Sequence, residues 1–254
     1  MYSIETDNLT KKYKNKTVVD NLNLKIKDGE LFALLGTNGA GKTTTIKMLT
    51  GLVKPTKGKI KILNLNLENN SQKIKTMLNI SPQETAIAPN LTVKENLEFF
   101  AGVYQIKDRN EKIEKLVKDF KLEKVIDEKA KKLSGGWQRR LSIALALING
   151  PKILFLDEPT LGLDVIARKE LWHIIEKLKG KITIILTTHY MEEAEALSDR
   201  IGIMKNGRVI ATGTAKSLMK QAKASTFEDA FVKIVTGEKS WIVRSLFLNA
   251  ISRS

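Results

Sequence analysis

The stretch Gly36–Thr44 most narrows what this chain can fold into. It fits the pattern G-x-x-x-x-G-K-[ST], in which a glycine-rich loop joins a strand to a helix. The apolar run 31–35 predicts a buried strand before the loop, and residues 44–49 predict a helix after it. Such a loop turns backbone N–H groups inward and adds the positive end of a helix dipole. The sequence therefore predicts a phosphate site, with Lys42 on the β- and γ-phosphates and Thr43 as an Mg²⁺ ligand.

Two further apolar runs end in polar side chains of the kind that a phosphate site needs. The run 153–156 predicts a buried parallel strand that delivers Asp157 and Glu158 at its carboxyl end. The run 181–186 delivers His189 in the same way. Open α/β sheets bind ligands at this edge. We expect Asp157 to hold Mg²⁺ through water, Glu158 to polarise the attacking water, and His189 to contact the γ-phosphate.

Composition sets the class of molecule. The chain has 254 residues and 42% hydrophobic content, which suits one large α/β domain or a domain with a subdomain. It contains no cysteine, so disulfides, cysteine metal sites and a cysteine nucleophile are excluded. Its first residues lack the pattern of a signal peptide, and no apolar run approaches the roughly 20 residues that span a bilayer. We therefore expect the chain to be soluble by itself.

The formal net charge of +15 leaves the partner open. Such a surface attracts nucleic acid, an anionic membrane leaflet or phosphates. Lysines spread over solvated faces explain the charge equally well.

The remaining segments predict how the chain is organised. Partial alternation over 3–5 and 18–26 predicts strands, with Tyr13 in the polar connection between them, where an aromatic ring could stack on a flat base. A loop tyrosine taken alone is more commonly plain surface. A capping box at 92–95 opens a helical stretch, and residues 84–150 predict a helical insertion between parts of a sheet.

Three later segments complete the predicted elements. Two glycines at 135–136 begin a helix and predict a second anion site. Residues 201–210 predict a hairpin with an Asn-Gly turn, and 226–235 an amphipathic helix. The apolar run 241–251 is too short to span a membrane. It could lie on a membrane surface, pack on the domain or fray, and we favour packing or fraying.

Taken together, these residues resemble the ATP-binding-cassette (ABC) ATPases over nearly the whole chain. Seven motifs stand in that family's order: an adenine-stacking aromatic at Tyr13, the Walker A loop at Gly36–Thr44, the Q-loop glutamine at Gln83, the signature at 133–138, Walker B at 153–158, the D-loop ending at Asp164, and the switch histidine at His189. The order and spacing of so many separate motifs make the resemblance specific.

The resemblance implies a fold, cofactors and a set of site residues. The fold is α/β, a P-loop NTPase of the ABC ATPase type, with a mixed sheet core, an antiparallel β subdomain and an inserted α-helical subdomain at about 84–150. The ATPase domain covers 1–237, and 238–254 forms a tail. ATP and Mg²⁺ are the implied cofactors. The implied catalytic residues are Lys42, Glu158 and His189; the implied nucleotide-binding residues are Tyr13, Gly36, Asn38, Gly39, Ala40, Gly41, Lys42, Thr43, Thr44, Gln83, Ser134, Gly135, Gly136 and Asp164; the implied metal ligands are Thr43, Gln83 and Asp157.

The resemblance also implies partners. The family uses its signature, here Ser134–Gly136, against ATP held by another copy, so we expect a homodimer or heterodimer that closes around ATP. Residues 43–52, 158–164 and 188–195 are similar to the exporter branch that includes daunorubicin-resistance and sodium-extrusion ATPases. That branch implies a separate ABC-2-type permease, peripheral association with the cytoplasmic face of the membrane, and export of a drug, ion, lipid or other small molecule.

Some positions depart from the family pattern, and two other functions compete. Thr37 replaces the usual proline, Leu161 a common serine, and 137–140 continue the signature in an uncommon way. The charge keeps open a soluble ABC ATPase that acts on nucleic acid or the ribosome, but the long coiled coils or second cassette of those classes are absent. A non-hydrolysing regulatory cassette is disfavoured by the full set of charged catalytic groups. No nucleic acid partner is therefore expected.

Overall fold

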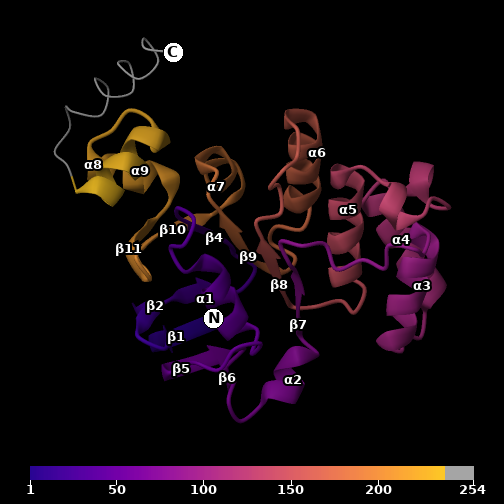
Figure 1. Cartoon of the computed structure of the whole chain (residues 1–254), viewed down its shortest axis with the longest axis horizontal. Helices are drawn as coiled ribbons and strands as arrows, with labels where there is room; N and C mark the ends of the chain where they lie inside the picture. The colour runs from indigo at the N-terminus through magenta and orange to yellow at the C-terminus, as the bar shows by residue number, and fades with distance from the viewer. Residues whose placement is uncertain (238–254) are drawn as a thin grey trace.

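The computed structural model describes residues 1–237, so the tail 238–254 and its apolar run lie outside the described residues. Two sheets form the framework (Figure 1). The larger has the strand order β11-β10-β4-β9-β8-β7, in which all neighbours are parallel except β11 and β10. Its strands are β4 (Leu31–Leu35), β7 (Leu78–Ser81), β8 (Ile153–Asp157), β9 (Thr183–Thr188), β10 (Arg200–Lys205) and β11 (Arg208–Gly213). The expected mixed sheet is confirmed.

The second sheet is antiparallel, which confirms the other expected sheet. Its order is β2-β1-β5-β6, and β3 also pairs with β1. Its strands are β1 (Tyr2–Tyr13), β2 (Lys16–Leu22), β3 (Lys25–Lys27), β5 (Lys57–Ile62) and β6 (Leu65–Asn66). Tyr13 is the last residue of β1 and pairs with Lys16, so the prediction that it lies in a loop between strands was wrong. The polar sequence around Tyr13 gave no apolar alternation, but pairing with β2 extends the strand nevertheless.

The central strands of the mixed sheet are buried on both faces. Every residue of β4, β8 and β9 is buried. Leu31, Ala33 and Leu35 of β4 enter one apolar cluster, and Phe32 and Leu34 enter another on the opposite face. The wholly apolar runs in the sequence therefore do mark buried parallel strands.

The helices between β7 and β8 form a group beside the mixed sheet (Figure 1). They are α3 (Val93–Val103), α4 (Arg109–Asp119) and α5 (Gly135–Ala146), with short 3-10 turns η1 (Glu123–Val125) and η2 (Ala130–Lys132) between the last two. The capping box at Thr92 and Glu95 is confirmed, because each side chain bonds the other residue's backbone N–H. Helices therefore occupy the stretch where the sequence predicts an insertion.

The remaining helices cover both sides of the sheet core. They are α1 (Lys42–Leu49), α2 (Ser71–Lys75), α6 (Val165–Glu176), α7 (Met191–Leu197), α8 (Ala215–Ala222) and α9 (Phe227–Thr236). The Asn-Gly hairpin is confirmed, with Asn206 at φ 49° and Gly207 at φ 81°. The predicted amphipathic helix is α9, and the Thr226 hydroxyl caps it by accepting from the Asp229 N–H. Within residues 1–237, no helix has the length and apolar character to cross a membrane.

Candidate functional site

The glycine-rich loop lies between β4 and α1 and has a shape that only glycines allow at key positions. Gly39 and Gly41 have φ values of 79° and 108°, in the left-handed region. A Cβ on Gly36 would lie 2.4 Å from the Met204 carbonyl oxygen, and one on Gly41 would lie 2.6 Å from that of Val18. The loop therefore follows the protein closely on one side and turns its other side to a cavity.

This cavity has a volume of about 370 Å³ and opens beside the N-terminus of α1. Most of its wall consists of residues that the sequence predicts as site residues. It is lined by Val18, Asn38, Gly39, Ala40, Gly41, Lys42, Thr43, Thr44, Gln83, Glu158, Leu161 and His189. A helix N-terminus with a buried lysine beside it suits the phosphates of a nucleotide. Val18 and Leu161 are apolar wall residues that sequence reasoning missed.

Lys42 is buried and heavily bonded. Its ammonium group donates to the Gly36 carbonyl at 2.7 Å and to the Thr37 carbonyl at 3.2 Å. The same nitrogen lies 3.1 Å from Glu158 Oε1, and both residues are 6% exposed. A charge so buried needs such partners, because burial without them is costly. The loop thus aims one cation into the cavity and fixes its position.

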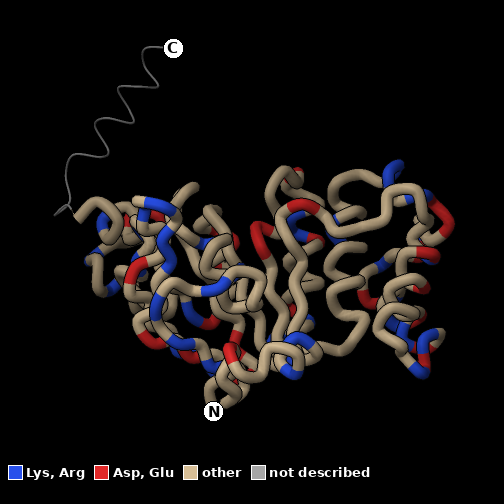
Figure 2. The backbone as a smooth tube through the Cα atoms, turned by 60° about the horizontal axis from the view of Figure 1, so that its bottom comes forward, with Lys and Arg blue, Asp and Glu red and all other residues tan. Residues whose placement is uncertain are grey.

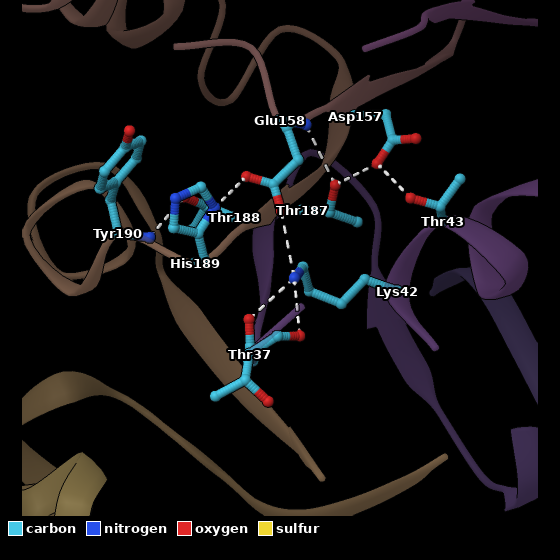
Figure 3. A network of polar contacts seen from close by, with 10 residues as sticks. Thr37, Lys42, Thr43, Asp157, Glu158, Thr187, Thr188, His189 and Tyr190 are labelled. Atoms are coloured by element: carbon cyan, nitrogen blue, oxygen red, sulfur yellow. Dashed lines mark hydrogen bonds and ion pairs between the residues drawn. The ribbon is translucent and has the colours of Figure 1, made fainter. Parts of the chain in front are cut away.

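The carboxylate of Glu158 lies between the Lys42 ammonium group and the His189 ring (Figure 3). Its Oε2 lies 2.7 Å from His189 Nδ1, while its Oε1 faces Lys42. Its backbone has φ 50°, an uncommon conformation for a residue with a side chain, and its N–H donates to the Thr187 carbonyl and hydroxyl, both at 3.1 Å. Strain of this kind concentrates at functional sites. The left-handed backbone at Glu158 ends the extended course of β8 and directs the carboxylate toward the cavity.

Asp157 lies at the end of β8 and faces the start of α1. The hydroxyl of Thr43 donates to Asp157 Oδ1 at 3.2 Å, and that of Thr187 donates to the same oxygen at 2.5 Å (Figure 3). The pairing of β8 with β9 puts Asp157 opposite Thr187. A hydroxyl and a carboxylate oxygen at this spacing are hard ligands of the kind that Mg²⁺ uses beside phosphates. The residues present therefore fit the implied cation.

The structure places the signature and the D-loop aspartate away from the lining of this cavity. Ser134 is the residue before α5, and Gly135 and Gly136 form its first turn. A Cβ on Gly136 would lie 3.1 Å from Ala167 of α6, so the signature packs against the segment after the D-loop. Asp164 caps α6 by accepting from the N–H groups of Ile166 and Ala167 at 2.9 Å.

Tyr13 also lies outside the residues that line the cavity. Its side chain is 46% exposed at the end of β1, and the Lys11 ammonium group lies 4.9 Å from the ring centroid. An exposed ring with a nearby cation can offer a flat stacking face.

Glu193 is a buried carboxyl next to the site that sequence reasoning missed. It lies on α7 and accepts from Trp172 Nε1 at 3.1 Å. Burial raises its pKa, the nearby Thr188 and Thr160 hydroxyls and the Trp172 N–H act in the opposite direction, and the charge of Glu158 adds to the rise. Its position in an acidic helical stretch resembles a solvated face, so the sequence carried no signal for it.

Comparison with known proteins agrees with this geometry. The sequence profile described as ABC transporter matches residues 19–161. The probable multidrug ABC transporter ATP-binding protein YbhF of Escherichia coli (strain K12) is 41% identical over 240 residues, which are 91% of this chain and 41% of that protein. The human phospholipid-transporting ATPase ABCA3 is 40% identical over 222 residues, 87% of this chain and 13% of that protein. The chain therefore spans about two fifths or less of these relatives.

Solved structures match over nearly their whole length. An ATP binding subunit of an ABC transporter has a TM-score of 0.81 and 29% identity, covering 91% of this chain and 98% of that one. The ATP-binding cassette MJ0796, solved as a dimer in a post-hydrolysis state with ADP and Pi, has a TM-score of 0.75 and 30% identity, covering 83% and 98%.

Proposed function

Because this chain belongs to the ABC transporter family and is an ATPase domain of it, we propose that it energises a separate ABC-2-type membrane permease. The cargo would be a drug, an ion, a lipid or another small molecule that is exported. The ATPase activity in this proposal rests on the Lys42–Glu158–His189 network beside the glycine-rich loop. The names of the relatives, which refer to multidrug and phospholipid transport, support the transport part.

Each residue of the network has a proposed role. The loop Gly36–Thr44 would hold the phosphates through its N–H groups and Lys42. Lys42 would exchange the Glu158 carboxylate for phosphate oxygens, which leaves Glu158 Oε1 free to accept a proton from the attacking water. His189 would keep Glu158 oriented through Oε2 and lie at the γ-phosphate. The side chains of Lys42, Glu158 and His189 already lie within hydrogen-bonding distance along this network.

A bound Mg²⁺ would supply charge neutralisation at the β- and γ-phosphates. Thr43, Asp157 and Gln83 are its proposed ligands. Two of them, Thr43 and Asp157, are in direct contact, and Gln83 lines the same cavity.

We further propose that two ATPase domains close around ATP. Ser134–Gly136 and Asp164 lie outside the lining of the chain's own cavity, which supports their use against a nucleotide held by a second copy or a homologue. The glycines at the start of α5 expose N–H groups and a helix dipole, which suit an anion. The dimer of MJ0796 supports the same arrangement by similarity.

The helical stretch offers a surface for the permease. Phe99, Val103 and Tyr104, at the end of α3, are large apolar or aromatic residues that are exposed. Exposed apolar side chains in a group favour a partner surface. We propose that the face formed by residues 84–104, next to Gln83, receives a helix of the permease. The chain would then associate with the cytoplasmic face of the membrane through that partner.

Affinity purification from detergent-solubilised membranes tests this proposal. With the full chain as bait, we expect an integral membrane protein to co-purify in constant proportion. Phe99→Asp should reduce its recovery about tenfold or more, because hot-spot losses exceed roughly 1.4 kcal/mol. Ile210→Asp is the matched control, since Ile210 is also exposed but lies on β11. Recovery of no membrane protein, or equal losses for both variants, would contradict the proposal.

The charge of +15 keeps open a second candidate function, an ABC ATPase that acts on nucleic acid or the ribosome. Figure 2 shows Lys and Arg interspersed with Asp and Glu along the backbone, rather than gathered in one stripe. Non-specific nucleic acid binding weakens steeply with salt. Strong stimulation of ATPase activity by DNA or RNA at 150 mM salt, roughly the physiological level, would favour this candidate over the transporter.

A further inference from the structure

Helix α5 carries two adjacent buried arginines that the proposed chemistry leaves unused. Arg139 and Arg140 are each 5% exposed. Arg140 pairs with Glu170 of α6 and lies over the Trp137 ring, 4.5 Å from its centroid. Arg139 points to a different part of the molecule, the segment that follows β7. The uncommon continuation of the signature therefore contains two arginines with separate targets.

Arg139 forms a fork of hydrogen bonds to the backbone beside Gln83. Its Nη1 donates to the Pro82 carbonyl and its Nη2 to the Gln83 carbonyl, each at 2.6 Å. Hydrogen bonds from a charged donor at such lengths are about twice as strong as neutral ones. Burial lowers the pKa of Arg139, whereas Asp157 and Glu193 favour its charged form.

A second contact joins the same two segments one turn further along α5. The hydroxyls of Ser142 and Ser81 lie 2.9 Å apart, and both residues are buried. Ser81 ends β7, and Ser142 follows Arg139 by three residues, so both side chains face β7. The end of β7 and the residues after it are thus held against α5 by side chains of two successive turns.

We propose that Arg139 is a positioning residue that joins the backbone at Pro82–Gln83 to the signature helix. Gln83 lines the chain's own cavity, and α5 begins at the signature glycines. With Arg139 in place, a displacement of α5 carries Gln83 with it. The state of the signature site is therefore transmitted to Gln83 through the Arg139 fork, and the Ser142–Ser81 contact supports the same join. This inference rests on the proposed role of Gln83 at the nucleotide.

Spin-label mobility tests the join without relying on activity. The chain has no cysteine, so Glu84→Cys gives a single labelling position next to Gln83, at an exposed residue. We expect Arg139→Met to increase the mobility of the label, because the two carbonyls lose their donors. Arg139→Lys keeps the charge without the planar fork and should give an intermediate mobility. Arg140→Met, the matched control, should leave it unchanged.

ATP turnover tests the consequence. Arg139→Met should lower kcat about tenfold, since small misplacements at a reacting centre are costly, with a smaller effect on KM. In the double variant Arg139→Met/Gln83→Ala, the loss of kcat should be smaller than the product of the two single losses. In Arg140→Met/Gln83→Ala, the two fold-losses should multiply. If Gln83→Ala leaves turnover intact, the role assigned to Gln83 fails. A label that responds equally to Arg139→Met and Arg140→Met, or to neither, would overturn the inference itself.

Discussion

Lys42 and Glu158 form a buried ion pair, with 3.1 Å between Nζ and Oε1, although one begins α1 and the other follows β8. The second oxygen of Glu158 meets His189 at 2.7 Å. One carboxylate thus joins Lys42 to His189. Lys42, Glu158 and His189 follow the parallel strands β4, β8 and β9, which end at the same edge of the sheet. The ion pair therefore also helps to hold this edge together.

The ion pair should contribute to stability. Lys42→Met leaves a buried carboxylate without its nearest cation, so we expect the free energy of unfolding to fall by about 3 kcal/mol. The double variant Lys42→Met/Glu158→Gln should recover much of this loss, because no unpaired charge stays buried. Urea denaturation of the wild type, of the single variants Lys42→Met and Glu158→Gln, and of the double variant measures the coupling. Losses that simply add would show that the pair contributes little.

Glu158→Gln should separate ATP binding from hydrolysis. The amide cannot accept the proton of the attacking water, so turnover should fall at least about 100-fold, while ATP stays bound. An ATP-dependent dimer should then be visible by size-exclusion chromatography. Phosphate release measures the turnover. Glu192→Gln, at an exposed residue of α7, is the matched control and should keep wild-type rates. Unchanged turnover in Glu158→Gln would refute the role of Glu158 as base.

Tyr13 should contribute to nucleotide affinity by stacking. Tyr13→Ala should weaken ATP binding by roughly 1–3 kcal/mol, the range for base–aromatic stacking, while Tyr13→Trp should retain it. Tyr2→Ala is a close control, since Tyr2 lies on the same strand, is 39% exposed and also has a lysine over its ring. Binding of a fluorescent ATP analogue gives the affinities. Equal affinities for both alanine variants would exclude the stacking role.

Glu193 should make stability depend on pH. Burial raises its pKa in the folded state, so the folded protein binds this proton more readily than the unfolded chain. The free energy of unfolding then falls as pH rises from the ordinary glutamate pKa, about 4.3, through the raised value. Glu193→Gln keeps an acceptor for Trp172 and should flatten this decline.

Chemical denaturation at a series of pH values measures the effect of Glu193. Glu195→Gln is the control, because Glu195 lies on the same helix but is exposed. It should follow the wild-type pH dependence. If Glu193→Gln shows the same slope as wild type, Glu193 does not titrate differently in the folded protein.

Local patterns in the sequence were enough for the core of the fold and for the residues around the cavity. The glycine-rich loop, the apolar strands before Asp157 and His189, the Thr92 capping box and the Asn-Gly hairpin each depend on neighbours within a few residues. Their physical causes, backbone freedom, burial and capping, are short in range.

Only the tertiary structure decided the features that depend on distant segments. Strand pairing made Tyr13 part of β1, and packing against the sheet stabilises the short helices α2 and α7, which have no side-chain cap and carry weak signals of their own. The sequence placed Lys42, Glu158 and His189 at one sheet edge, but their mutual bonds depend on the parallel register of β4, β9 and β8. Likewise, the targets of Arg139 and the burial of Glu193 follow from how α5 and α7 lie against that sheet, a long-range packing that no local pattern encodes.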